Sequence, residues 1–126
     1  MGAFIVELEN KPGQLARLAE TVAAKGVNIT ALADVAWGSA GAVGLAASDE
    51  VAARSALTEG GFTFREVELV SSSLMDEPGS LARAARKLAE AGVNIELSFV
   101  TGWGTGEVVM AFGVDKPEAA RAALAG

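Results

Sequence analysis

The chain has 126 residues, 51% of them hydrophobic, and a formal net charge of −6 at neutral pH. This acidic balance argues against nucleic acid as a partner, because contacts of Lys and Arg with phosphates dominate that affinity. The sequence contains no Cys, His or Tyr, which excludes disulfides and thiolate metal sites and removes the usual general base. We therefore expect no metal, no cofactor and no enzymatic activity.

Neither a targeting signal nor a membrane span is expected. The first residues lack a basic region before an apolar stretch, so they do not resemble a signal peptide. The most apolar window, residues 29–47, contains Thr30, Asp34 and three glycines. This composition favours a strand, a turn and a second strand over a membrane-spanning helix. We expect a cytoplasmic protein.

The first residues predict a strand followed by a helix. Bulky and β-branched residues at 4–8 are typical of a strand. From Leu15 onward, apolar residues recur on one face of a helix that we expect over residues 12–25. Asn10 precedes it as a candidate N-cap, and Gly26 follows its end, where glycine is common.

A hairpin, a short helix and a further strand come next. Residues 27–37 and 42–47 predict two strands around the glycine-rich turn at 38–41. Asp49 is a candidate N-cap for a helix over 50–59. Residues 62–70 alternate apolar and polar side chains, which predicts a strand.

The second half of the chain repeats the first at an offset of 66 residues. Residues 76–95 match residues 10–29 at 11 of 20 positions. The pattern predicts a helix over 78–91, a hairpin of strands 93–103 and 107–114, and a helix over 116–125. A counterpart of strand 62–70 is missing from this second copy. An internal repeat of this kind determines the architecture of the whole chain.

These elements define the expected fold. The order β-α-β-β-α-β is the ferredoxin-like arrangement. We therefore expect an α+β protein of two such repeats, residues 1–69 and residues 70–126, the second (β-α-β-β-α) lacking its last strand. Units of this size bury little surface alone, so we expect the halves to pack together or the chain to form a homodimer.

Two motifs, each present twice, resemble those of the ACT domain. They are ENKPGQL at 9–15 with GVNI at 26–29, and DEPGSL at 76–81 with GVNI at 92–95. The chain is most similar to small proteins made of two tandem ACT domains. That resemblance implies a regulatory protein that binds a free amino acid and has a metabolic enzyme as a partner.

The resemblance also implies which residues contact the ligand. They lie in the loop before the first helix of each copy and at the start of the following strand: Asn10, Lys11, Pro12, Gly13, Gln14, Leu15, Asn28 and Ile29, with Asp76, Glu77, Pro78, Gly79, Ser80, Leu81, Asn94 and Ile95 in the second copy. If two copies pair along their second strands, the Asn10 loop approaches Asn94 and the Asp76 loop approaches Asn28. Ligand sites would then lie between the repeats.

The chemistry of these residues suits a zwitterion. Free N–H groups at a helix start can receive a carboxylate, and Asn side chains offer both a donor and an acceptor. Asp76 can hold an ammonium group by a charge-assisted hydrogen bond. Because Asn10 occupies the equivalent position in the first copy, we expect the two sites to differ in affinity or in preferred ligand.

Structural interpretations of the same residues remain open. Asn10 and Asp76 can serve only as N-caps, and Asn28 and Asn94 can serve only to cap the backbone where helix turns into strand. Trp37 and Trp103 can line a pocket near the hairpin tips or pack at an interface, and Arg17 and Arg83 are expected on a solvated helix face. The alternative function is an interaction or scaffolding subunit without a ligand that docks on a metabolic enzyme through the open sheet edge.

Overall fold

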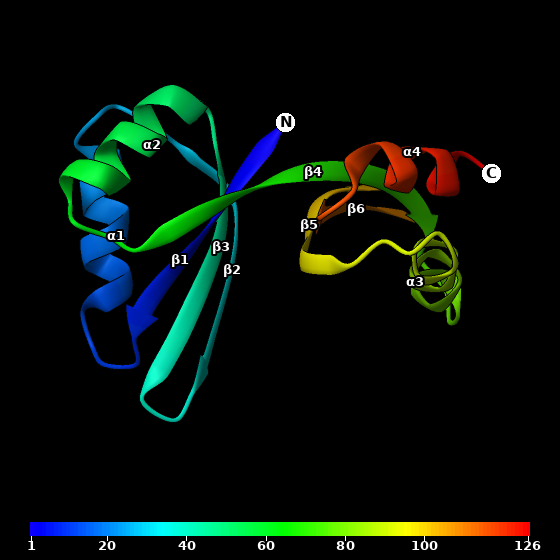
Figure 1. Cartoon of the computed structure of the whole chain (residues 1–126), viewed down its shortest axis with the longest axis horizontal. Helices are drawn as coiled ribbons and strands as arrows, with labels where there is room; N and C mark the ends of the chain where they lie inside the picture. Colours follow the sequence, from blue (N-terminus) through cyan, green and yellow to red (C-terminus); the bar gives the residue numbers. More distant parts are fainter. The chain divides into compact units, whose positions relative to one another are not determined.

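A computed structural model describes all 126 residues of the chain. The chain divides into an N-terminal unit, Gly2–Glu66, and a C-terminal unit, which comprises Val67–Gly126 together with Met1. The boundary falls inside one long strand, β4 (Phe64–Met75), whose first residues belong to the N-terminal unit (Figure 1). No helix is long and apolar enough to cross a membrane.

The N-terminal unit is a sheet covered on one face by two helices (Figure 1). Its elements are β1 (Gly2–Glu9), α1 (Gln14–Ala23), β2 (Ile29–Trp37), β3 (Ala40–Ala47), α2 (Glu50–Glu59) and the start of β4. The strands β2, β3 and β1 are neighbours in that order, and both pairs are antiparallel. Because side chains alternate along each strand, one face of the sheet carries the apolar residues.

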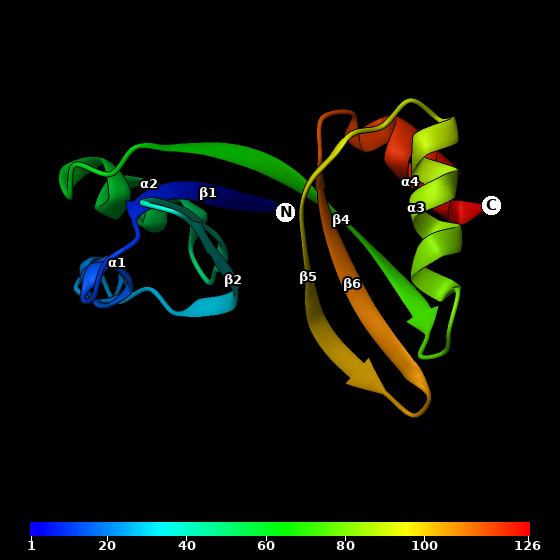
Figure 2. The same cartoon turned by 90° about the horizontal axis from the view of Figure 1, so that it is seen from below.

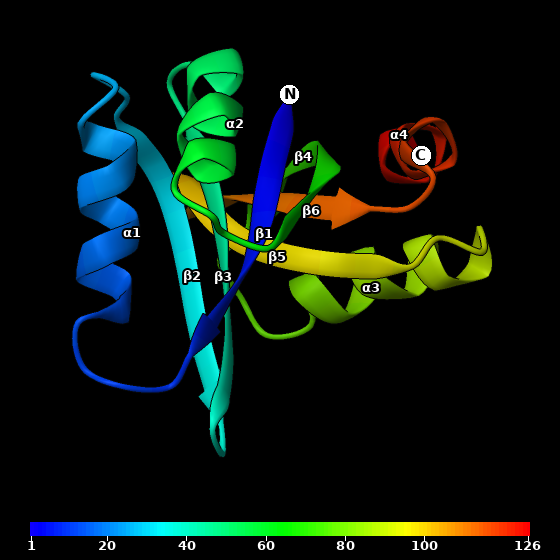
Figure 3. The ribbon, with the colours of Figure 1, turned by 60° about the vertical axis from the view of Figure 1, so that its left-hand side comes forward.

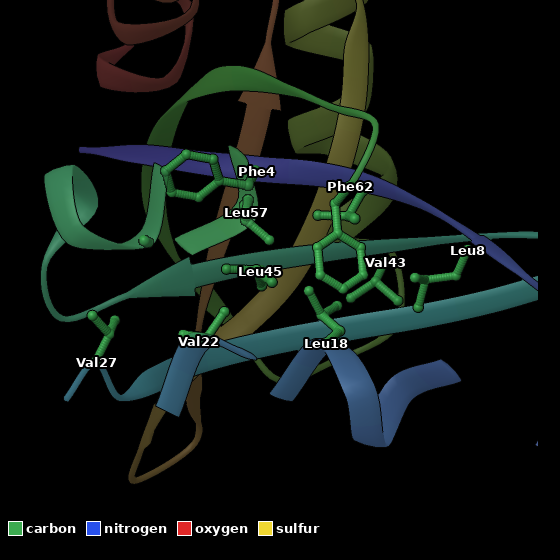
Figure 4. Close-up of a cluster of buried hydrophobic side chains, with 11 residues drawn as sticks. Phe4, Leu8, Leu18, Val22, Val27, Val43, Leu45, Leu57 and Phe62 are labelled. Atoms are coloured by element: carbon green, nitrogen blue, oxygen red, sulfur yellow. The ribbon is translucent and has the colours of Figure 1, made fainter. Parts of the chain in front are cut away.

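The core of this unit forms where the helices meet that apolar face (Figure 4). Leu18 and Val22 of α1 are fully buried and pack with Val43 and Leu45 of β3. These helix positions are four residues apart and therefore share one face. The expected strands and the expected helix over 50–59 are confirmed. Asp49 caps α2 by accepting a hydrogen bond of 3.0 Å from the Ala52 N–H.

The C-terminal unit has the same plan without a final strand (Figure 2). Its elements are the remainder of β4, α3 (Ser80–Glu90), β5 (Ile95–Gly104), β6 (Glu107–Val114) and α4 (Pro117–Ala125). The strand order is β4, β6, β5, again antiparallel. A separate apolar cluster, centred on Leu88 and Phe112, lies between sheet and helices. The α+β fold of two ferredoxin-like repeats, the second lacking its last strand, is confirmed.

The predicted starts of the first helix in each copy are wrong by two residues. The N-cap of α1 is Gly13, with φ of 89°, and that of α3 is Gly79, with φ of 93°. Residues with a Cβ rarely adopt this left-handed conformation, so the chain turns into the helix only after the glycine. Neither helix start receives a hydrogen bond from a capping side chain.

Candidate functional site

Asn10 joins the β1–α1 loop to the tip of the neighbouring hairpin. Its main-chain N–H donates to the Ser39 carbonyl oxygen at 3.0 Å, and its side-chain Nδ2 donates to the Gly38 carbonyl oxygen at 2.8 Å. The interpretation of Asn10 as an N-cap is therefore wrong, because its amide is engaged by the hairpin and Gly13 holds the cap position. Figure 3 shows the loop and the hairpin tip at the same end of the N-terminal unit.

The start of α1 keeps free hydrogen-bond donors. The N–H of Arg17 already bonds to the Gly13 carbonyl oxygen at 3.0 Å, and the N–H of Gln14 reaches the Lys11 carbonyl oxygen at 3.5 Å. Leu15 and Ala16 lie between them in the first turn, where an N–H has no partner inside the helix. This leaves two donors directed out of the helix start, an arrangement that favours anionic groups.

A small cavity of about 90 Å³ lies beside this loop. It is lined mainly by polar side chains of both charges, from the loop and from the strand face opposite: Leu8, Glu9, Asn10, Lys11, Gln14, Leu15, Asp34, Ala36 and Gly41. Four of the residues expected in the first site therefore line it. Pro12 and Gly13 form the turn and do not line it. Glu9 and Lys11 pair with each other at 3.0 Å.

The equivalent loop of the C-terminal unit is held differently. The Asp76 main-chain N–H donates to the Gly106 carbonyl oxygen at 2.9 Å, as the Asn10 N–H does in its own hairpin. The Asp76 carboxylate forms no hydrogen bond or ion pair, so its interpretation as an N-cap is also wrong. The side chain of Asp76 has no N–H group, so unlike the side chain of Asn10 it cannot donate to a carbonyl oxygen of the hairpin. This carboxylate is therefore available to a ligand.

A larger cavity of about 340 Å³ lies beside the Asp76 loop. Its wall is acidic on the loop side and apolar on the strand side, and is made of Leu74, Met75, Asp76, Glu77, Ser80, Leu81, Val100, Trp103, Val108 and Met110. Four residues expected in the second site line it, and Pro78 and Gly79 do not. Val100 stands 66 positions after Asp34, so the repeat replaces a carboxylate by an apolar group at this wall.

Apart from Trp103, the strand residues of both walls were missed by the sequence reasoning. Asp34, Val100 and Met110 were not candidates, because the motifs that carry the resemblance end before these strands. The alternation along β2 and β5 gives the available signal, since it places every second side chain on the face that carries the loop. Which of those side chains reach the cavity depends on the loop's path, which alternation does not specify.

Asn28 and Asn94 lie at the other end of their sheets. In the N-terminal unit Ile29 pairs with Ala47, whereas Trp37 at the hairpin tip pairs with Ala40. Figure 3 shows the α1–β2 connection opposite the β1–α1 loop. Within one unit, the loop and the asparagine therefore do not meet.

The main chains of both asparagines join neighbouring strand ends. The Asn28 N–H donates to Ser48 Oγ at 3.0 Å, and the Asn94 N–H donates to Asp115 Oδ1 at 2.8 Å. In return, the carbonyl oxygens of Asn28 and Asn94 accept from the main-chain N–H groups of the same partners. Their own side-chain amides make no hydrogen bond, so the capping is done by the backbone and not by the amide.

The two tryptophans have different surroundings. Trp37 is 90% exposed and lines none of these cavities, whereas Trp103 is 76% exposed and lines the larger one. Arg17 is exposed, as expected for a solvated helix face, but its side chain also has specific partners. Its guanidinium lies 4.1 Å from the centroid of the Phe62 ring, and its Nη1 donates to the Gly60 carbonyl oxygen at 3.3 Å.

No group of three or more carboxylates converges to hold a metal ion.

The fold of the chain is ACT-like, and solved structures share it. No known family model and no curated protein matches the sequence. Protein BT0572 from Bacteroides thetaiotaomicron is similar in structure, with a TM-score of 0.79 and 24% identity over 98% of this chain and 85% of that one.

Two further similar structures are regulatory subunits of aspartate kinase. The subunit from Thermus thermophilus, in its ligand-free form, has a TM-score of 0.68 and 18% identity, over 98% of this chain and 89% of its own. The subunit from Thermus flavus has a TM-score of 0.66 and 19% identity, over 98% and 90%. At these identities the similarity establishes the ACT-like fold of the chain.

Proposed function

We propose that this chain is a regulatory protein that binds a free amino acid at the β1–α1 and β4–α3 loops. The observation that carries the proposal is the coincidence, twice in the chain, of an uncapped helix start with an adjacent cavity. The free N–H groups of the first turn suit the α-carboxylate. The similarity to regulatory subunits of aspartate kinase supports the same role.

The C-terminal cavity is the stronger of the two sites. Asp76 supplies an unpaired carboxylate for the α-ammonium group, which forms a charge-assisted hydrogen bond. Val100, Val108 and Met110 offer an apolar wall for the ligand's side chain. This combination favours an amino acid with an apolar side chain. The N-terminal cavity is smaller, and two of its charged residues, Glu9 and Lys11, already pair with each other, so its affinity is expected to be weaker.

The proposal includes the assembly in which the sites work. Asn28, Ile29, Asn94 and Ile95 are proposed to complete a site with the loop of another repeat, so that the ligand lies between repeats. A cytoplasmic homodimer is the proposed form. The regulated partner is proposed to be a metabolic enzyme, and the protein itself is proposed to have no catalytic activity.

A thermal-unfolding screen of the twenty common amino acids tests this function. A ligand at about 100 times its Kd stabilises the fold by about 2.7 kcal/mol, which raises Tm by several degrees. One amino acid or a small chemically related group is expected to raise Tm, and glycerol at equal concentration serves as the control. If none of the twenty shifts Tm, the ligand-binding role is wrong and the docking role remains.

A docking subunit without a ligand is the second candidate function. It is favoured by one observation: past Leu69, which bonds to Met1, no strand is paired with β4 on the side opposite β6. An unpaired strand edge presents N–H and C=O groups in a row and recruits further strands. The edge and the Asp76 cavity are formed by different residues, so the two candidate functions can be tested separately.

A further inference from the structure

The strand β5 contains one residue more than the corresponding part of β2. In β5 the register shifts between Val100 and Gly102, whose partners are consecutive residues of β6. Thr101 between them therefore has no residue of β6 opposite it. In the N-terminal unit the stretch from Asp34 to Trp37 is paired with β3 without a shift. An extra residue of this kind is a β-bulge, which can re-aim a side chain that follows it.

Hydrogen bonds of the two loops confirm the extra residue. The Asn10 N–H donates to the Ser39 carbonyl oxygen, and the Asp76 N–H donates to the Gly106 carbonyl oxygen. The two donors stand 66 positions apart in the sequence, whereas the two acceptors stand 67 apart. One residue is therefore inserted in the second repeat between the loop and the hairpin turn, as the register of β5 requires.

The insertion moves Trp103 to a different place from Trp37. In the sequence repeat Trp103 stands 66 positions after Trp37. In the sheet, Trp37 lies in the last pair before its turn, opposite Ala40. Trp103 lies one pair further from its own turn, opposite Val108. The structural counterpart of Trp103 is therefore Ala36.

This change of place brings Trp103 into the larger cavity, of about 340 Å³. In the N-terminal unit Ala36 and Gly41 form one strand pair, and both line the smaller cavity. Trp103 and Val108 form the matching pair of the C-terminal unit, and both line the larger one. Trp37 follows Ala36 and points to the opposite face of its sheet, because side chains alternate along a strand.

The lining of the larger cavity combines carboxylates and an indole ring, and no Lys or Arg belongs to it. Asp76 and Glu77 stand on the loop side and Trp103 on the strand side, among aliphatic side chains. Glu77 lies 3.4 Å from Arg83, which does not line the cavity, whereas Asp76 has no partner. A carboxylate binds an ammonium group by a charge-assisted hydrogen bond, and a Trp ring attracts a cation more strongly than other aromatic rings.

We propose that Trp103 is a specificity-determining residue of the Asp76 cavity, which takes an ammonium compound with an apolar body. The ammonium group lies between the Asp76 carboxylate and the indole ring, and the apolar body lies along Val100 and Met110. The smaller cavity has Ala36 in place of the indole and binds this class of ligand more weakly. The inference rests on the proposed function in placing a ligand in this cavity, but it concerns the ammonium group of that ligand and not its carboxylate.

The two tryptophans provide the test, because the chain contains no other Trp and no Tyr. Only Trp103 emits in the Trp37→Phe variant, and only Trp37 emits in the Trp103→Phe variant. L-leucine and 3-methylbutylamine, which is leucine without its carboxylate, are titrated into both variants. Each compound is expected to shift the emission of Trp103 to shorter wavelength, because it displaces water from an indole that is 76% exposed. The emission of Trp37 is expected to stay unchanged.

Isothermal titration calorimetry measures the contribution of the ring. Trp103→Ala is expected to weaken both compounds about tenfold, as the loss of a desolvated cation–π contact predicts. Trp37→Ala removes the same side chain from the opposite face of the other sheet and is expected to leave both affinities unchanged. Thermal unfolding confirms that each variant is folded. Equal affinities of the wild type and Trp103→Ala would overturn the role of Trp103.

A third compound, 4-methylpentanoate, is leucine without its ammonium group and is expected not to bind. If it binds as tightly as L-leucine, or if neither L-leucine nor the amine binds, the ammonium site is wrong. Binding of L-leucine that Trp103→Ala does not weaken overturns this inference and leaves amino-acid binding intact. Binding of the amine but not of L-leucine, weakened by Trp103→Ala, supports this inference and contradicts the proposed amino-acid ligand. Binding of L-leucine that Trp103→Ala weakens supports both.

Discussion

The guanidinium of Arg17 lies over the ring of Phe62, 4.1 Å from its centroid, and joins α1 to the segment that leads into β4. The same side chain donates to the Gly60 carbonyl oxygen. Its counterpart Arg83 instead lies near Ser80 and Glu77, with Nη2 at 3.3 Å from Ser80 Oγ and 3.4 Å from Glu77 Oε1. The different partners of the two arginines reflect the main difference between the repeats. The first repeat contains the segment with Phe62, and the second repeat has no counterpart of it.

The first prediction measures this Arg17–Phe62 contact. Phe62→Ala is expected to reduce the free energy of unfolding by about 3–5 kcal/mol, because it leaves a cavity in the core. Arg17→Ala is expected to cost about 0.5–1 kcal/mol for the exposed cation–π contact. Urea denaturation of both single variants and the double variant gives the coupling energy, and additivity within error would show that the contact contributes nothing.

The second prediction concerns the glycine that precedes α1. Gly13 has a positive φ and open space around its Cα, so that a Cβ at this position would meet no other atom within 4 Å. Gly13→Ala is therefore expected to cost about 1–2 kcal/mol from backbone strain alone. Asp49→Ala, which removes the side-chain cap of α2, is expected to cost a similar amount, about 0.5–2 kcal/mol. If Gly13→Ala is neutral in thermal unfolding, the left-handed N-cap is wrong.

The third prediction is a pH dependence of stability. Arg54 donates to both oxygens of the Glu66 carboxylate, and this contact holds the pKa of Glu66 below its ordinary value of 4.5. A carboxyl group with a lowered pKa stabilises the fold above its unfolded-state pKa, and this stabilisation is lost as pH falls through the folded-state pKa. The pair is thus expected to stabilise the protein above about pH 4.5 and progressively less below it.

The Arg54→Ala variant isolates this effect. Both side chains are more than a third exposed, at 43% and 41%, so solvent screening keeps the loss of stability at neutral pH small. The difference in unfolding free energy between wild type and variant is expected to shrink as pH is lowered from 6 to 3. A difference that stays constant over this range would exclude the pair as its source. Arg86→Ala, which lacks this partner, is the control.

The fourth prediction concerns the Asp76 carboxylate. Asp76→Asn is expected to weaken the amino acid found in the thermal screen by about tenfold or more, since a hydrogen bond to a charged group contributes about 1.5–3 kcal/mol. Isothermal titration calorimetry measures the change. Glu90→Gln, an exposed carboxylate of α3 outside both cavities, is the control and is expected to have no effect. Equal affinities for wild type and Asp76→Asn would remove Asp76 from the site.

Local sequence patterns predicted most of the elements. The alternation of apolar and polar residues at 62–70, the helical spacing of Leu18 and Val22, and the Asp49 cap each involve residues close to one another in the sequence. Such patterns can be recognised in a short window of the sequence. The boundaries of α1 and α3 were wrong because the left-handed conformation of Gly13 and Gly79 delays the helix, and a glycine alone does not reveal its φ.

The candidate site was predictable only in part. The loop residues Asn10 and Asp76 stand in recognisable motifs, and both line cavities. The roles of their side chains depend on hairpins that lie about thirty residues further along the chain, at Gly38 and Gly106. The walls supplied by Asp34 and Val100 come from the same distant strands. Long-range contacts of this kind have no local signature.

By itself, the amino-acid sequence determined that the chain is a duplicated α+β unit and that the second copy lacks a strand, because repetition and periodicity are properties of the order of residues. Only the tertiary structure decided that the Asn10 amide is bound to a hairpin while the Asp76 carboxylate is free, and that Arg83 borders a cavity where Arg17 covers a ring. These differences arise from which backbone groups and side chains meet across the sheet, and that depends on the packing of segments distant in sequence.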